Sequence, residues 1–273
     1  MPRFITDDRQ VDKTNPVEIK VICAGPPRAA TSSMQAAMER LGFGPCMHMA
    51  HMLPHAERTQ LMLNAVREQD REKRHEMIRE LMAGHASVAD FPVIFFAADL
   101  MDMYPEAAIV LNQRKSAEQW TASAKESFEF FFSWRFPLVC MLFRTERLWY
   151  ALNVETMRMF DRLYGNPAPW TVDAYEGHRR WVLDEARKRG RRVLEFVPEE
   201  GWGPLCHFLD AEVPDEAFPR LNEKETFRTI RRIFIAKGLL GWLALGGSVW
   251  AGWKFGPIGV RFLRDVLRSY VSV

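Results

Sequence analysis

A short apolar segment followed by a loop and an amphipathic helix constrains the fold of this chain more than any other feature. Residues 17–25, VEIKVICAG, alternate in polarity, become continuously apolar and stop at Gly25, which predicts a short buried strand. Beyond the loop, apolar residues recur at helical spacing, at Met34, Ala37, Met38 and Leu41. Gly42 then provides a C-terminal stop. The segment therefore predicts a strand–loop–helix unit.

The loop of this unit, GPPRAATS at 25–32, resembles a phosphate-binding turn in which two residues are replaced. In the pattern G-x-x-x-x-G-K-[ST], Gly25 and Ser32 occupy the first and last positions. Ala30 replaces the second glycine, and Thr31 replaces the lysine. Because the lysine is missing, hydrolysis of ATP or GTP by the usual mechanism is not expected.

The remaining features of the loop still favour an anion. Main-chain N–H groups of 28–33 are predicted to lie at the N-terminus of the helix, where the helix dipole favours negative charge. The side chains that could contact such an anion are three hydroxyl groups and one guanidinium, on Thr31, Ser32, Ser33 and Arg28. The loop is therefore predicted to bind an anionic group.

Other parts of the chain alternate between strand-like and helix-like segments. Further short apolar segments predict strands at 107–114, at 193–198 and within 87–96, where a short strand leads into a helix capped near Asp90. Helical patterns are found at 56–83, after Ser116, over 125–165 and within 200–209. This alternation predicts an α/β fold with a central parallel sheet flanked by helices.

Composition and local polarity divide the 273 residues into three parts. Residues 1–16 are polar and are predicted to form a flexible arm, 17–226 one α/β domain, and 227–273 an apolar helical tail. The formal charge of +2 gives no indication of nucleic-acid binding, although basic residues cluster at 187–192. Four widely spaced cysteines without a C-x-x-C pair, and no secretory signal at the N-terminus, predict a reduced, cytoplasmic setting.

The tail contains sixteen uncharged residues, 238–253, between Lys237 and Lys254. Trp242, Trp250 and Trp253 suit a membrane interface, glycines are frequent, and arginines flank the segment at 228, 231, 232, 261 and 264. The segment is short for a full span of about twenty residues. Three interpretations stay open: membrane association, a buried core helix, and a hydrophobic lid over an apolar substrate.

Four blocks of sequence resemble the P-loop sulfotransferase-like family common in fungi. The first is the strand followed by GPPRAATSSMQAAMERLGFGPCMHM. The others are ADFPV at 89–93, IVLNQRKSAEQWTAS at 109–123 and LEFVPEEGWGPLCHFLDAEVPDEAFPRLNE at 194–223. Together they extend over about residues 17–223, and their order and spacing make the resemblance specific.

The resemblance implies a three-layer P-loop fold and 3′-phosphoadenosine 5′-phosphosulfate as the sulfonate donor, with no metal. It implies that the loop holds the 5′-phosphosulfate through Gly25, Arg28, Ala30, Thr31, Ser32 and Ser33. Arg28 matches the basic residue that stabilises charge on the bridging oxygen as sulfonate leaves. Arg114 and Ser123 match the pair that holds the 3′-phosphate. The acceptor is expected to be a hydroxyl of a hydrophobic small molecule; the oligomeric state is not predicted.

Sulfonate transfer needs a base for the acceptor hydroxyl. Asp90 is the first candidate because it follows a predicted strand, near the edge where α/β proteins form their sites. A helix N-cap is the alternative interpretation of Asp90. His48 is the second candidate, and its alternative is a hydrogen-bonded core histidine. A metal face formed by His48, His51 and His55 is not expected, because Pro54 interrupts the helix.

Ala30 is the main departure from the family pattern, which has glycine there. If the position requires positive φ, alanine costs about 1–2 kcal/mol. Two alternatives to sulfonate transfer therefore stay open. One is a diverged enzyme that uses the loop for another phosphorylated or isoprenoid-diphosphate substrate. The other is a non-catalytic, membrane-associated binding protein.

Overall fold

The computed structural model describes residues 11–12, 14, 17–52, 55–91, 93–221 and 223–271. The side chains of 140, 223–224 and 257–271 are not described. Most of the predicted arm at 1–16, and the side chains of Arg261 and Arg264, lie outside the described parts.

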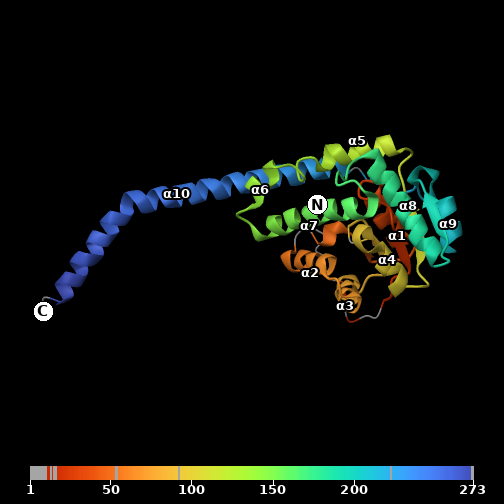
Figure 1. The fold of residues 1–273 in the computed structure, drawn as a ribbon, viewed down its shortest axis with the longest axis horizontal. Coiled ribbons are helices and arrows are strands. Elements are labelled where there is room, and N and C mark those ends of the chain that lie inside the picture. The colour runs from red at the N-terminus through yellow and green to blue at the C-terminus, as the bar shows by residue number, and fades with distance from the viewer. Residues whose placement is uncertain are drawn as a thin grey trace.

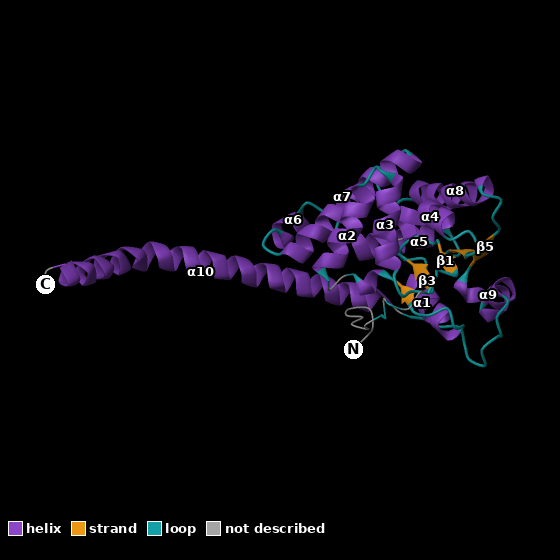
Figure 2. Cartoon of the chain, turned by 90° about the horizontal axis from the view of Figure 1, so that it is seen from below, coloured by secondary structure: helices purple, strands orange, loops and turns teal. Residues whose placement is uncertain are grey.

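Five parallel strands form one sheet, in the order β2-β3-β1-β4-β5 (Figure 2). Their bounds are β1 Val21–Cys23, β2 Cys46–Met47, β3 Ser87–Ala89, β4 Ala108–Asn112 and β5 Val193–Phe196. The central strand β1 pairs with β3 through Val21 and Ser87, and with β4 through Val21 and Ala108. The two-residue strand β2 was not predicted, because Cys46 and Met47 are too few to give a periodic pattern.

Helices cover both faces of the sheet, because alternate residues of β1 point to opposite sides. Val21 and Cys23 pack with residues of α1 (Thr31–Arg40) and α9 (Trp202–Leu209). Ile22 packs in a larger apolar cluster. That cluster includes residues of α4 Val93–Met103, α5 Ala117–Phe128, α7 Arg144–Tyr164 and α8 Val172–Lys188. The predicted α/β fold is confirmed, with three layers.

The structure divides two of the predicted helical regions. The segment 56–83 forms α2 (Ala56–Arg67) and α3 (Arg71–Met82). They separate at 68–70, where the side chain of Asp70 accepts hydrogen bonds from the first N–H groups of α3. The segment 125–165 contains the end of α5, a short helix α6 (Arg135–Cys140) and α7. Periodicity located these helices but not their breaks.

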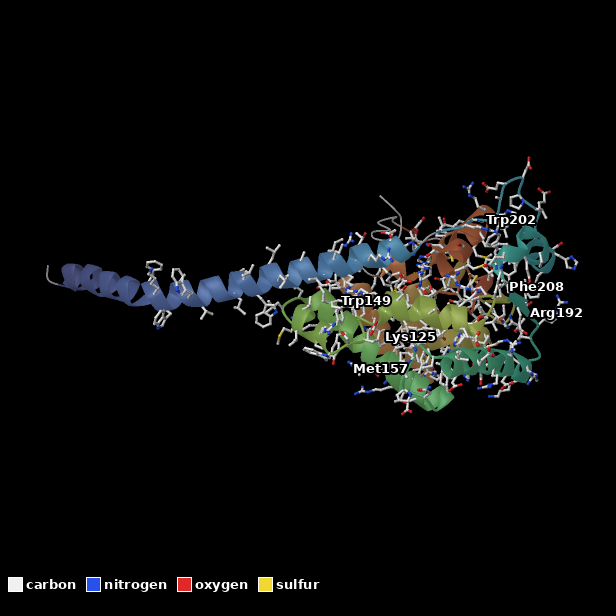
Figure 3. The ribbon with its side chains drawn as sticks, turned by 90° about the horizontal axis from the view of Figure 1, so that it is seen from above. Lys125, Trp149, Met157, Arg192, Trp202 and Phe208 are labelled. Carbon is white, nitrogen blue, oxygen red and sulfur yellow. The ribbon has the colours of Figure 1, made fainter. Side chains whose placement is uncertain are left out.

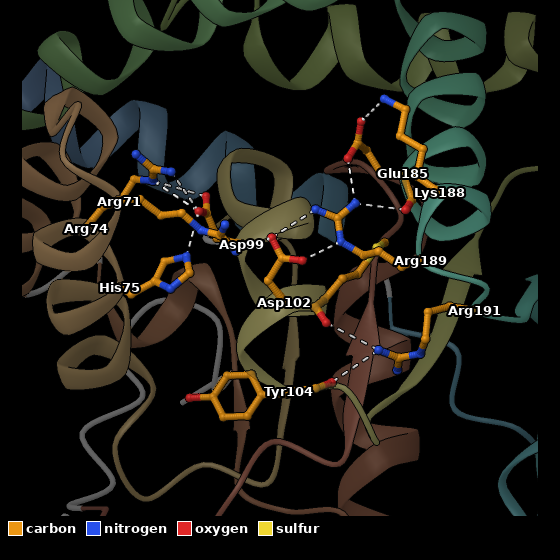
Figure 4. Close-up of polar contacts among 11 residues, drawn as sticks. Arg71, Arg74, His75, Asp99, Asp102, Tyr104, Glu185, Lys188, Arg189 and Arg191 are labelled. Carbon is orange, nitrogen blue, oxygen red and sulfur yellow. Dashed lines mark hydrogen bonds and ion pairs between the residues drawn. The ribbon is translucent and has the colours of Figure 1, made fainter.

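An ion-pair network joins α3, α4 and α8 (Figure 4). Arg189, in the basic cluster at 187–192, forms ion pairs with Asp102 and with Glu185. The hydrogen bond from Arg189 is the main cause that lowers the pKa of Asp102. Arg191 donates to the main-chain carbonyls at 101, 104 and 107. These two arginines of the cluster therefore hold the packing of helices together.

The last helix, α10 (Glu223–Val271), extends away from the domain and bends toward its C-terminal end (Figure 1). Residues 225–256 are long and apolar enough to cross a membrane: an 18-residue window within them has a mean hydropathy of 1.5, and 6% of that window is buried. The boundary predicted between residues 226 and 227 falls inside α10. Figure 3 shows side chains crowded on the domain, with the outer part of α10 lying apart from it.

Candidate anion-binding and catalytic site

The strand–loop–helix unit predicted from the sequence forms the centre of the site. Because all five strands are parallel, their carboxyl ends open at one edge, where α/β proteins bind ligands. The loop at 24–30, Asp90 after β3 and Asn112 at the end of β4 all lie at that edge. Gly25 is required there by close approach: a Cβ on this residue would lie 2.1 Å from the main-chain oxygen of Asn112.

The main-chain carbonyls of the loop are held by donors of the surrounding structure. His178 Nε2 donates to Ala24 O over 2.8 Å, and Trp120 Nε1 donates to Pro27 O over 2.8 Å. Both side chains are buried and come from helices on the same face of the sheet. They fix the path of the loop where it leaves β1.

Two side chains from the end of β4 hold the second part of the loop. Arg114 Nε donates to Arg28 O over 2.8 Å. Asn112 is fully buried; its Nδ2 donates to Ala29 O over 2.7 Å while its Oδ1 accepts the N–H of Gly25 over 3.0 Å. With a turn bond from Ala29 N–H, the carbonyls of Ala24, Pro26, Pro27, Arg28 and Ala29 all have donors.

The first helical turn after the loop supplies N–H groups. The first bond inside α1 runs from Met34 N–H to Ala30 O, so the N–H groups of Thr31 and Ser33 have no acceptor within the helix. Carbonyls held by other donors, next to N–H groups at a helix N-terminus, form an arrangement that binds anions. The structure therefore has the elements of the predicted cradle.

Three residues of the site adopt left-handed backbone conformations that glycine normally favours. Arg28 has φ 74°, Ala30 has φ 58° and Asp90 has φ 66°. Each costs about 1–2 kcal/mol in an L-residue unless its surroundings impose it. The sequence left open whether residue 30 needs a positive φ. The structure shows that it has one, although the residue is alanine.

Arg28 is 3% exposed and lies between two other elements. Its Nε donates to Ser123 Oγ of α5 over 3.3 Å, and its guanidinium lies over the ring of Phe227, 5.2 Å from the centroid. Arg114, in addition to the bond from its side chain to Arg28 O, donates its main-chain N–H to the hydroxyl oxygen of Tyr175 over 3.1 Å. Arg114, after β4, and Ser123, within α5, thus both form a hydrogen bond with Arg28.

Asp90, His48 and Thr31 form a buried polar group beside the loop. Thr31 Oγ1 donates to Asp90 Oδ1 over 3.3 Å, and His48 Nε2 lies 3.6 Å from Asp90 Oδ2. His48 Nε2 also lies 3.3 Å from Thr31 Oγ1. His48 Nδ1 accepts the N–H of Ala50, so the proton of the neutral ring is on Nε2, facing the carboxylate. Both candidate bases therefore face the loop.

Two adjoining cavities lie against these residues. The first is lined by loop residues, by His48 and Asp90, and by Thr226, Phe227 and Ile230 of α10. The second is lined by mostly aromatic side chains. They share four lining residues, Met49, Phe128, Phe227 and Ile230. A polar cavity thus continues directly into an apolar one.

The polar groups that line the apolar cavity are Asn153 and Trp149. Asn153 Nδ2 donates to Phe131 O, whereas the buried indole N–H of Trp149 has no partner among the described residues. In the described parts of the chain, no group of three or more His, Cys, Asp or Glu side chains is placed to hold a metal ion.

Sequence reasoning did not identify Asn112, Trp120 and His178 as parts of the site. Asn112 had one signal, a polar side chain at the end of an otherwise apolar strand. Trp120 lies in the block 109–123 that resembles the family, but nothing in the sequence indicated its bond to the loop. His178 had no signal, because only the tertiary packing brings α8 behind the loop.

Comparisons with known proteins agree with this geometry. Residues 20–227 match the protein family described as a sulfotransferase domain. The chain is also 31% identical over 214 residues to the Ava biosynthesis cluster protein M of Aspergillus versicolor. That alignment covers 74% of this chain and 80% of the relative.

Proposed function

The chain belongs to the P-loop sulfotransferase-like family, and from this premise we propose that it transfers a sulfonate group from 3′-phosphoadenosine 5′-phosphosulfate to a hydroxyl of a hydrophobic small molecule. The observation that carries the proposal is the loop at 24–30, whose carbonyls are held by other donors. Its N–H groups and the buried Arg28 suit the phosphosulfate of the donor.

Arg28 is proposed to stabilise the leaving group. Its guanidinium, held by Ser123 and Phe227, neutralises the charge that develops on the bridging oxygen as the bond from sulfur to the 5′-phosphate breaks. At the start of α1, Ser32 and Ser33 contribute hydroxyl and N–H donors to the same group, and Thr31 contributes its main-chain N–H, since its hydroxyl donates to Asp90. The donor nucleotide supplies the activated sulfonate, and adenosine 3′,5′-bisphosphate leaves.

Asp90 is the proposed base. As the acceptor oxygen forms its bond to sulfur, the hydroxyl proton passes to the carboxylate of Asp90. His48 is less suited to this step, because its Nδ1 already accepts the N–H of Ala50 and its Nε2 carries the proton. His48 instead orients the carboxylate, and Thr31 does the same from the other oxygen.

Arg114 and Ser123 are proposed to hold the 3′-phosphate. Arg114 uses Nε for the carbonyl of Arg28, which leaves its two terminal nitrogens for a dianion. Ser123 Oγ lies beside Arg28 in the same region. This role separates the proposed donor from ordinary adenine nucleotides.

The apolar cavity is the proposed acceptor site. Its aromatic lining buries a hydrophobic molecule, and its junction with the polar cavity directs a hydroxyl toward Asp90. The relative is named as a protein of a biosynthesis cluster. We therefore propose a small-molecule acceptor of secondary metabolism.

The proposed location is the cytoplasm, with α10 associated with a membrane. Cys23, Cys46 and Cys206 are buried free thiols, which suits a reducing compartment. The length and composition of residues 225–256 support the membrane association.

A thermal-shift titration tests the proposal against the use of another anion. Adenosine 3′,5′-bisphosphate is expected to stabilise the protein at micromolar concentration, and Arg114→Ala is expected to remove most of that stabilisation. The exposed Arg187→Ala, which lies in the basic cluster away from the loop, serves as the matched control. Stabilisation by pyrophosphate or a prenyl diphosphate without any response to the nucleotide would replace sulfonate transfer with the diverged chemistry. No response to any of these anions would favour a non-catalytic binding protein.

A further inference from the structure

Helix α10 connects the two cavities to the apolar tail in a fixed order. Thr226 lines the polar cavity, Phe227 and Ile230 line both cavities, and Phe234 lines the apolar cavity. Leu239, the first strongly exposed apolar residue after the docked turns, is 59% exposed. At a rise of 1.5 Å per residue, Leu239 lies only about 7–8 Å beyond Phe234 along the helix axis. The apolar cavity is therefore the part of the site nearest to the tail.

Contacts with α6 and the start of α7 determine where α10 leaves the domain. Lys237 Nζ forms an ion pair over 2.5 Å with the buried carboxylate of Glu146. Gly238 packs so closely that a Cβ would lie 2.5 Å from the side chain of Val139. Trp242 Nε1 then donates to Leu138 O over 2.8 Å. From there to residue 256 α10 is mostly exposed, so α6 lies directly beside its point of departure (Figure 1).

An apolar surface surrounds this point of departure. On and beside α6, three large apolar side chains are exposed: Trp134, Leu138 and Met141. On α10 the exposed ones include Leu239, Leu240, Leu243, Val249, Trp250 and Trp253. Exposed apolar groups on one helix alone would suit a lid or a packing helix. Here they are found on two helices that contact each other, and we call these side chains together the α6–α10 surface.

Cations surround the α6–α10 surface. Arg135, Arg144, Arg147, Arg231 and Arg232 are exposed, and none forms an ion pair with another described residue. Arg231 instead lies over the ring of Phe130, and Arg147 donates to the carbonyl of Met141. Unpaired arginines around an apolar surface match the anionic head groups of a lipid bilayer. A second protein copy, with the same positive charge, would be repelled.

The length of the uncharged segment also agrees with a lipid bilayer as the partner of this surface. Residues 238–253 extend over about 24 Å as a helix, and a bilayer core is about 30 Å thick. Lys254 can extend toward the head groups at its end of the segment, which reduces the length that must be apolar, while Lys237 is held by Glu146 at the domain. A bilayer that holds this segment reaches the domain at α6.

We infer that the α6–α10 surface docks the domain on an anionic lipid bilayer, and that the acceptor enters the apolar cavity from the bilayer rather than from water. The acceptor class is then a membrane-dissolved amphiphile with one hydroxyl, which moves along α10 past Phe234 and presents its hydroxyl to Asp90. The identity of the hydroxyl as the reacting group depends on the proposed function, whereas the docking and the entry route do not.

Hydrogen exchange with the full-length protein tests the docking. Vesicles of phosphatidylcholine and phosphatidylglycerol at three to one are expected to slow amide exchange in peptides from 132–142 at least fivefold, with no change in peptides from 204–215. The triple variant Trp134→Gln, Leu138→Gln, Met141→Gln is expected to lose the protection at 132–142 while α10 still binds the vesicles. Val213→Gln, at a 62%-exposed site far from α10 in sequence, is the matched control and is expected to behave as wild type.

A photoreactive long-chain alcohol dissolved in the same vesicles tests the entry route. A mid-chain diazirine is expected to label segments 128–132 and 227–234. Ile230→Trp, which fills the junction of the cavities, is expected to reduce this labelling at least fivefold without releasing the protein from vesicles. Labelling confined to 239–256 would overturn the entry route, and unchanged exchange at 132–142 would overturn the docking. A dimer that forms without binding vesicles would also overturn it.

Stabilisation by adenosine 3′,5′-bisphosphate is measured on the same samples. If the nucleotide does not stabilise the protein but docking and labelling are observed, the proposed function alone is refuted. If the nucleotide stabilises the protein but docking or labelling is not observed, this inference alone is refuted.

Discussion

His178 Nε2 donates a hydrogen bond of 2.8 Å to the carbonyl oxygen of Ala24, where β1 ends and the anion loop begins. The other ring nitrogen of His178 accepts the hydroxyl of Tyr164 over 2.8 Å. Only a neutral ring can form both bonds at once, because a protonated ring still donates from Nε2 but has no acceptor for the Tyr164 hydroxyl. Burial lowers the pKa of His178 to about 4. One buried neutral imidazole thus joins α7, α8 and the start of the loop.

Protein stability is expected to fall as the pH decreases from about 6.5 to 4. The unfolded chain binds a proton on His178 near its ordinary pKa of 6.5, while the folded protein binds it only near 4. The contribution is therefore fully present above about pH 6.5 and is lost below it; the difference corresponds to about 3 kcal/mol. Chemical unfolding as a function of pH measures it. His178→Gln should flatten this slope and the exposed His207→Gln should not; equal slopes in all three proteins would contradict the assignment.

Asn112→Leu is expected to destabilise the protein by about 2–4 kcal/mol and to weaken the binding of adenosine 3′,5′-bisphosphate. The leucine keeps the volume but leaves the N–H of Gly25 and the carbonyl of Ala29 buried without partners. Urea unfolding and calorimetric titration measure the two effects. Gln113→Ala, at the next residue, removes only an exposed bond to Glu195 and is the matched control. A destabilisation no larger than that of the control would show that Asn112 does not hold the loop.

Ala30→Gly is expected to stabilise the protein slightly, by up to about 1 kcal/mol. At φ 58° the change relieves the strain of an L-residue, and the greater backbone freedom of glycine in the unfolded chain offsets part of the gain. Ala29→Gly removes a buried methyl group beside the same loop and is expected to destabilise, which makes it a useful contrast. Thermal denaturation compares the three proteins. If Ala30→Gly lowered the melting temperature, the left-handed conformation assigned to residue 30 would be wrong.

Asp90→Asn is expected to leave the fold and nucleotide binding intact while it slows sulfonate transfer about 10²–10⁴-fold. Asparagine tolerates the left-handed conformation at φ 66°, so the backbone is preserved. Transfer to 2-naphthol, used as an apolar acceptor probe and followed by mass spectrometry, measures the rate. The half-exposed Asp184→Asn is the charge-matched control. If Asp90→Asn kept a rate within threefold of wild type, Asp90 would not be the base.

The sequence predicted the fold well because its evidence was local. An apolar run that stops at Gly25, followed by helical spacing, marks one strand–loop–helix unit, and the alternation of such segments predicts a parallel sheet. The breaks in 56–83 and 125–165 were missed because each depends on a cap or a turn within a continuous helical pattern. The strand β2 was missed because two residues have no period.

The residues that could take part in the chemistry of the site were predictable from the sequence, whereas the residues that hold the loop in place were not. Arg28, Thr31, His48 and Asp90 were selected by residue type and position, and the structure brings them together at one cavity. Asn112, Trp120 and His178 act on main-chain carbonyls, and any part of the sequence could supply such donors. A hydrophobic lid over an apolar substrate was one open interpretation of the tail, but hydropathy alone could not show that Phe227 and Ile230 at its start line both cavities.

The central claim is that the loop and the residues behind it recognise a nucleotide with a 3′-phosphate. Isothermal titration of the full-length protein with adenosine 3′,5′-bisphosphate and with adenosine 5′-monophosphate tests it most directly. The proposed roles of Arg114 and Ser123 predict a micromolar or lower Kd for the bisphosphate, at least tenfold below that of the monophosphate. Equal affinity for the two nucleotides, or no binding of either, would contradict the claim.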